Sequence, residues 1–230
     1  MAPRYDTVGW LTRDGFTLLA TASVGLAKRM ETTPSRRVLV SHAINGAARK
    51  DAGHAVLAVV QALTARGAIL PPVAIELPEP GELFEAFRVT QSAEAWRSHG
   101  AWVDAHPGAL AKDVEARFAW ARDVSSEREE EGLAAAAELT AVIDKALGYD
   151  VLVLPSTASA APAVGAEFEA LEVLREATIG MTAIAGLTGR PALSVPLAMT
   201  EDGPVGVCLV GPRGSDLALI ELGLEWQAAL

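Results

Sequence analysis

Residues 155–165 gather small and hydroxyl-bearing side chains in the order P-S-T-A-S-A-A-P-A-V-G. The four residues before them, V-L-V-L, form an apolar run typical of a buried strand. In α/β proteins, ligands usually bind at loops that follow strand ends, where polar groups are held next to a rigid sheet. The sequence therefore predicts that residues 155–165 form a loop suited to contact a ligand.

The histidines do not follow a metal-binding pattern. They are His42, His54, His99 and His106. No H-E-x-x-H or C-x-x-C spacing occurs, so we expect no metal ligand in this chain and no cofactor. A G-x-S-x-G run is also missing, which argues against the nucleophile turn of α/β-hydrolases.

Composition indicates one globular domain spanning residues 1–230. Half of the residues are hydrophobic and 21% are charged. The net charge of −10, with basic residues scattered along the chain, argues against nucleic acid as a partner. No apolar run is long enough to span a bilayer, so no membrane association is expected. The single cysteine, Cys208, lies in an apolar run and fits a reducing cytoplasm.

The elements that must position the loop follow from apolar periodicity. Residues 191–197 and 205–210 read as two strands of a buried hairpin, joined by the turn sequence T-E-D-G-P. A strand, helix, strand unit that favours parallel pairing is predicted upstream. Its members are residues 37–41, 51–66 and 73–77. Further helices are predicted at residues 14–27, 79–99, 109–147 with a break at 123–126, 172–185 and 215–228. The predicted fold class is α/β.

Three stretches of this sequence resemble the amidase-signature hydrolases, whose catalytic trio is Lys, cis-Ser and Ser. They are Y-D-T-V-G-W-L-T-R-D at residues 5–14, D-V-L-V-L-P-S-T at 150–157, and A-G-L-T-G-R-P-A-L-S-V-P with G-P-V-G-V-C-L-V-G-P-R-G from residue 185 onward. The resemblance implies the C-terminal part of the amidase-signature fold, a mixed central sheet flanked by helices. It also implies hydrolysis of carboxamides to acid and ammonia. Residues 87–103 are most similar to indole-acetamide hydrolases.

The resemblance assigns two substrate-binding candidates. Thr157 matches the place of small hydroxyl residues near the acyl pocket, and Thr182 matches a threonine nine residues before the strand proline. The alternative is that Thr157 stabilises its loop through a local hydrogen bond and that Thr182 packs in a helix. Trp96 and Trp102, around a predicted helix break at residues 98–100, either wall an aromatic pocket or anchor the core.

No catalytic residue is assigned. In the resembled family the catalytic Lys and the Gly/Ser-rich loop lie ahead of the D-T-V-G segment, and only six residues precede Thr7 here. None of the lysines lies near a Gly/Ser-rich loop that could complete the trio. They are Lys28, Lys50, Lys112 and Lys145.

Three hypotheses remain open. The chain is a partial amidase that is truncated and inactive alone, a non-catalytic binding protein (a pseudoenzyme), or one half of a split amidase. The binding protein would fold alone or dock with another chain that bears the missing half. The surface that such a half would cover predicts a complementary chain that carries it, or self-association.

Overall fold

The computed structural model describes residues 2–26 and 31–230, and within them five strands form one mixed sheet in the order β2-β1-β3-β5-β4. The strands are β1 (Val38–Val40), β2 (Val73–Ala74), β3 (Val151–Pro155), β4 (Ala192–Thr200) and β5 (Gly203–Val210). β1 pairs in parallel with β2 and β3, whereas β5 is antiparallel to both β3 and β4. This confirms the predicted mixed sheet, although β2 is shorter than residues 73–77.

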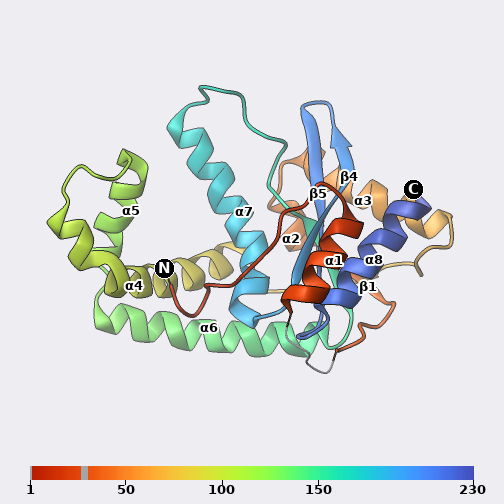
Figure 1. The fold of residues 1–230 in the computed structure, drawn as a ribbon, viewed down its shortest axis with the longest axis horizontal. Helices are drawn as coiled ribbons and strands as arrows, with labels where there is room; N and C mark the ends of the chain where they lie inside the picture. The colour runs from red at the N-terminus through yellow and green to blue at the C-terminus, as the bar shows by residue number, and fades with distance from the viewer. Residues whose placement is uncertain (1, 27–30) are drawn as a thin grey trace.

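Helices surround this sheet unevenly. They are α1 (Gly15–Gly25), α2 (His42–Gly46), α3 (Lys50–Ala65), α4 (Pro80–Ala105), α5 (Lys112–Arg122), α6 (Ser126–Leu147), α7 (Phe168–Thr188) and α8 (Asp216–Ala229). Figure 1 shows α1, α3 and α8 at the end of the molecule that contains the sheet, and α4 and α5 at the opposite end. α6 runs beneath both parts, and α7 rises between α5 and the sheet.

The core is centred on β3 and β5. Every residue of β3 is buried, and Val207 of β5 is fully buried between the neighbouring strands. The prediction of a buried hairpin is correct for β5 and wrong for β4. β4 is the edge strand, and Ala192, Ser194 and Pro196 are exposed on one of its faces. Its other face packs on α8, where a Cβ at Gly223 would lie 2.7 Å from Leu193 Cδ2.

The first helix begins where the sequence predicts it, because the Asp14 side chain caps α1 by accepting from Thr17 N at 2.7 Å. This helix does not lie on the core. Only Ala22 of α1 is buried, while Phe16 is 74% exposed. α1 packs on α8, so it forms an outer layer rather than part of the core. Ala27, the last residue of the predicted helix, lies outside the described residues.

The helix break predicted at residues 98–100 is not present, because α4 continues to Ala105. Gly100 is buried against the side chain of Trp96, whose Cε2 would lie 2.7 Å from a Cβ at this position. The glycine therefore makes room for an indole ring instead of ending the helix. Among residues 2–26 and 31–230, no helix is both long and apolar enough to cross a membrane.

Candidate functional site

The loop after β3 leaves the sheet through two hydroxyl residues, Ser156 and Thr157. The Ser156 N–H donates to the carbonyl of Gly206 at 2.8 Å, which extends the β3–β5 ladder by one residue. Thr157 is exposed, and its hydroxyl donates to the carbonyl of Ser159 at 2.7 Å. This bond is the local loop contact considered as the alternative for Thr157, and it leaves the oxygen of Thr157 able to accept from a ligand.

Thr178 of α7 connects this loop to the helix that carries the second candidate. Its hydroxyl accepts a hydrogen bond from Ala158 N at 2.9 Å and donates to Leu174 O at 2.8 Å. Thr182 is half-buried one turn later, and its hydroxyl donates to the carbonyl of Thr178 at 2.8 Å. Thr178 thus lies between the segments of Thr157 and Thr182, whose hydroxyls share no hydrogen bond. Sequence reasoning missed Thr178, although its four-residue spacing from Thr182 places both on one helix face.

A pair of serines on the open face of the sheet was also missed. Ser156 Oγ and Ser194 Oγ lie 2.6 Å apart, at hydrogen-bonding distance, and are exposed. Gly206 lies between them, since a Cβ there would come within 2.6 Å of Ser156 Oγ and closer still to Ser194 Oγ. A glycine at this position of β5 therefore allows the hydroxyl of Ser156, just after β3, to meet the hydroxyl of Ser194 on β4.

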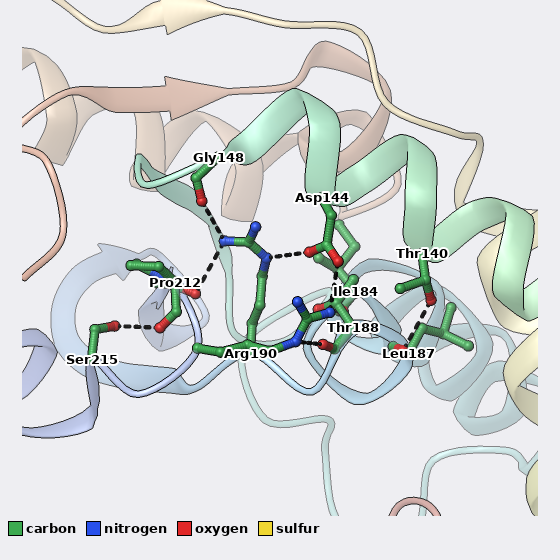
Figure 2. Close-up of polar contacts among 11 residues, drawn as sticks. Thr140, Asp144, Gly148, Ile184, Leu187, Thr188, Arg190, Pro212 and Ser215 are labelled. Carbon is green, nitrogen blue, oxygen red and sulfur yellow. Dashed lines mark hydrogen bonds and ion pairs between the residues drawn. The ribbon is translucent and has the colours of Figure 1, made fainter. Parts of the chain in front are cut away.

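The joint between α7 and β4 is held by a buried arginine. Arg190 follows Gly189, which ends α7 in the left-handed conformation with φ of 64°. The Arg190 side chain is only 5% exposed. Its Nε donates to Asp144 Oδ1 at 3.0 Å, and its Nη1 donates to Gly148 O at 3.1 Å, as Figure 2 shows. A buried guanidinium requires such partners, so the start of β4 is fixed against the end of α6.

Arg213 ties the same region from the other side. Its Nη2 donates to the second oxygen of Asp144 at 2.6 Å, and its Nε donates to Thr188 O at 2.6 Å. The Asp144 carboxylate thus accepts from two arginines, one on each oxygen. This network fixes the last residues of α7 and the first of β4, the two elements that carry Thr182 and Ser194.

The chemistry available to these side chains is hydrogen bonding. Within the described part of the chain, the bonds of Ser156, Thr157 and Ser194 run to other hydroxyls and to backbone groups. A hydroxyl becomes a strong nucleophile only when a base removes its proton, and no lysine, histidine or carboxylate bonds to any of the three there. The exposed hydroxyls are suited to bind and orient a polar ligand.

None of the described lysines bonds to the hydroxyls of Ser156, Thr157 or Ser194. Lys50 opens α3, Lys112 opens α5 and Lys145 lies in the last turn of α6, whereas Lys28 is outside the described residues. Among the residues that the structure describes, no group of three or more His, Cys, Asp or Glu side chains could hold a metal ion.

The two tryptophans proposed for an aromatic pocket both lie on α4. Trp96 is half-buried, and the guanidinium of Arg122 lies 4.8 Å from its ring. Trp102 is 50% exposed and stacks on the ring of His106 at 4.5 Å. Each ring has its own partner on α4, α5 or the segment between them.

Known proteins that are similar to this chain share its fold and match the sequence around its sheet. The family model described as Amidase matches residues 48–220, and the chain therefore belongs to the amidase family. Among curated relatives, Amidase 1 of Arabidopsis thaliana is 26% identical over 253 residues, covering 96% of this chain and 60% of the relative. The chain thus spans about three-fifths of that relative's length.

Solved structures show the same scaffold. A structure described as an amidase superposes with a TM-score of 0.78 at 25% identity, covering 95% of this chain and 52% of the other. A glutamyl-tRNA(Gln) amidotransferase component from Thermotoga maritima gives a TM-score of 0.64 at 18% identity, covering 86% of this chain and 43% of that one. At this identity the second likeness concerns the fold alone. The particular likeness to indole-acetamide hydrolases is not confirmed.

Proposed function

We propose that this chain forms the C-terminal part of an amidase that hydrolyses carboxamides to the acid and ammonia. The Amidase match over residues 48–220 carries this proposal. In such a reaction an activated hydroxyl attacks the amide carbon, ammonia leaves, and water then releases the acid from the acyl intermediate. We assign none of the activated groups to this chain, so it contributes the sheet and part of the substrate pocket.

The substrate-contacting residues that we propose are Thr157 and Thr182. Thr157 is exposed on the loop after β3, next to the serine pair, and this is a common place for ligand contacts. Thr182 lies on the face of α7 that the loop meets through Thr178. Hydroxyls on two adjacent elements can bond to the carbonyl and the amide group of one ligand.

We further propose that a complementary polypeptide supplies the Lys and the Gly/Ser-rich loop. One structural relative is itself named as one of the subunits of an amidotransferase. The N-terminal segment ahead of α1 also exposes apolar side chains, since Val8 is 78% and Leu11 is fully exposed. Exposed apolar side chains on a structured segment are typical of surfaces that bind another chain.

An amide-hydrolysis assay tests these proposals. We expect the purified chain alone to release no ammonia from indole-3-acetamide, benzamide or short aliphatic amides. Addition of a polypeptide that carries the Lys and Gly/Ser-rich loop of an amidase should restore turnover. Turnover by the chain alone that disappears on a point substitution within it would contradict the proposed need for a partner.

Substitutions in the reconstituted enzyme test the two threonines. Thr157→Val and Thr182→Val should lower kcat/KM by about tenfold each, the effect of one hydrogen bond to a polar ligand. Thr64→Val is the matched control, because Thr64 makes the same bond to the carbonyl four residues earlier, within α3. Unchanged kcat/KM in both the Thr157→Val and the Thr182→Val enzyme would contradict the proposed substrate contacts. If amides bind but no mixture turns them over, the result would favour a binding protein.

A further inference from the structure

Helix α5 lies at the end of the molecule opposite the sheet, and it buries little of its own surface (Figure 1). Of its 11 residues only Ala121 is buried, and the helix packs chiefly on α4. Short segments, residues 106–111 and 123–125, join it to α4 and α6, and Gly108 in the first has a φ of 75°. An isolated helix of this length is marginal in water, so α5 depends on its docking contacts to stay helical.

The main aromatic contact of α5 is made to charged groups. The ring of Trp120 lies 4.4 Å from the guanidinium of Arg88 on α4 and 5.3 Å from that of Arg128 on α6. Glu85 of α4 accepts from both arginines, from Arg88 Nη2 at 2.6 Å and from Arg128 Nη2 at 2.8 Å. Cation–π contacts at partly exposed sites are individually weak, so this docking contact can open.

Two ion pairs complete the docking of α5. Arg117 Nη2 lies 3.1 Å from Glu172 Oε1 of α7, and the Arg122 guanidinium bonds to Asp104 of α4. All four side chains are partly exposed. Dissolved salt screens ion pairs that water reaches, and such pairs contribute little to stability. The hold on α5 is therefore both weak and sensitive to salt.

Two buried polar atoms next to α5 have no hydrogen-bond partner among the residues that the structure describes. One is Nε2 of His99, whose ring meets the ring of Phe118 edge-on, with 6.5 Å between the ring centres. The other is Nε of Arg88, whose guanidinium lies against Trp120. Burial of a polar atom without a partner is costly, so docking α5 over these two groups carries a cost that undocking would relieve.

We propose that α5 is a lid that undocks from α4, α6 and α7 while the rest of the protein stays folded. The docking contacts are few and partly exposed, and two unpaired polar atoms oppose them, so the closed and open forms differ little in free energy. Residues 106–111 and 123–125 are the hinges, because they connect α5 to helices that have their own packing partners. The lid is independent of the function proposed above.

Hydrogen–deuterium exchange of the full chain, followed by mass spectrometry, tests the lid. The amides of α5 should exchange together and faster than those of β3, because undocked α5 loses its helix. Arg128→Gln should speed this exchange by about fivefold, the effect of one cation–π contact and one exposed ion pair, and leave β3 unchanged. Arg36→Gln is the matched control, since Arg36 pairs with a partly exposed glutamate, Glu225 of α8, and should not affect α5.

His99→Leu should have the opposite effect and slow the exchange of α5 by about fivefold, because it removes a buried atom that lacks a partner. If His99 only supported the packing of α5, the same substitution would speed the exchange. Raising the ionic strength to about 1 M, where the Debye length is about 3 Å, should speed exchange in α5 but not in β3. Equal exchange of α5 and β3 in the wild type, or faster exchange of α5 in His99→Leu, overturns the proposal.

Discussion

The serine pair on the open face of the sheet depends on a residue with no side chain. Ser156 directly follows β3 and Ser194 lies on β4, and these two strands are not neighbours because β5 lies between them. Their hydroxyls meet only because Gly206 leaves the space above β5 empty. Gly206, which has no side chain, therefore determines whether the hydroxyls of Ser156 and Ser194 can meet.

Gly206→Ala should disrupt this pair, because the new methyl group would lie 2.6 Å from Ser156 Oγ. We expect a loss of about 1–3 kcal/mol in the free energy of unfolding, as for other overpacked sites, measured by urea denaturation. The loss should shrink in a background that carries Ser156→Gly and Ser194→Ala, where neither hydroxyl meets the new methyl group. An equal loss in both backgrounds would show that the clash is not with these hydroxyls.

Cys208 should be chemically silent in the folded protein. Burial raises the pKa of its thiol to about 12, and the thiolate is the reactive form. We expect no reaction with a thiol reagent at pH 8 in native buffer and one equivalent after denaturation, since the chain has one cysteine. Fast native labelling would show that β5 opens readily.

The same burial sets the sign of a pH effect. The folded protein keeps the thiol proton above the usual pKa of 9.0, while the unfolded chain releases it. The contribution of Cys208 to stability therefore falls as the pH rises from about 9 towards 12.

At the residue scale, sequence reasoning identified hydroxyls that bear on the site but not how they meet. The resemblance to amidase-signature hydrolases pointed to Thr157 and Thr182 as substrate-binding candidates. In the structure, each hydroxyl donates to a backbone carbonyl near it in sequence. Whether they also contact a substrate stays a prediction. Ser194 could not be placed beside Ser156, because their contact depends on a strand register set by long-range pairing.

At the element scale, the two strands of the hairpin have different tasks. β5 is paired on both sides, whereas β4 is paired on one side only within the described sheet. Val207 is fully buried, while Leu193 of β4 is half-buried against α8. Substitutions in the two strands should therefore differ in cost.

Val207→Asp should abolish soluble expression or reduce stability by several kcal/mol, because it buries a carboxylate without a partner. Leu193→Asp should cost less, since its partly exposed position on an edge strand lets water reach the charge. Thermal melting of each variant, or the soluble yield where melting fails, measures the difference. Equal losses would mean that β4 is as enclosed as β5.

Helices and strands could be predicted from the sequence where apolar residues recur regularly and where capping or turn residues mark the ends. Other elements could not be predicted. α3 and the α5–α6 break follow the predicted boundaries within a few residues. α4 extends past the expected break, and Gly100 packs against the ring of Trp96 one turn earlier in the same helix. The placement of α1 on α8 could not be predicted, because an amphipathic pattern does not show which surface it meets.

At the scale of the whole molecule, several large apolar side chains are exposed on the surface. Val164 is fully exposed and Phe168 is 53% exposed on the segment that leads into α7. Val8 and Leu11 add a second group ahead of α1. We expect residues 1–230 to fold as one domain whose surface favours association.

Light scattering at micromolar concentration, with titration of a hydrophobic dye, tests this expectation. The chain should self-associate or bind the dye, and a complementary polypeptide should suppress both. Leu11→Ser should reduce dye binding without lowering the melting temperature, because this side chain is fully exposed. A monodisperse monomer without dye binding would favour a self-sufficient binding protein.

The Arg190 network has a consequence for how the protein opens. One side chain bonds to Asp144 and Gly148 at the end of α6 and, at 3.5 Å, to Gly211 after β5. If any one of these chain segments unfolded locally, the buried guanidinium group would lose a hydrogen-bond partner. Opening one segment alone is therefore unfavourable in free energy. The last turn of α6, the start of β4 and the end of β5 should therefore exchange their amide hydrogens as a single cooperative unit, although they lie far apart along the chain.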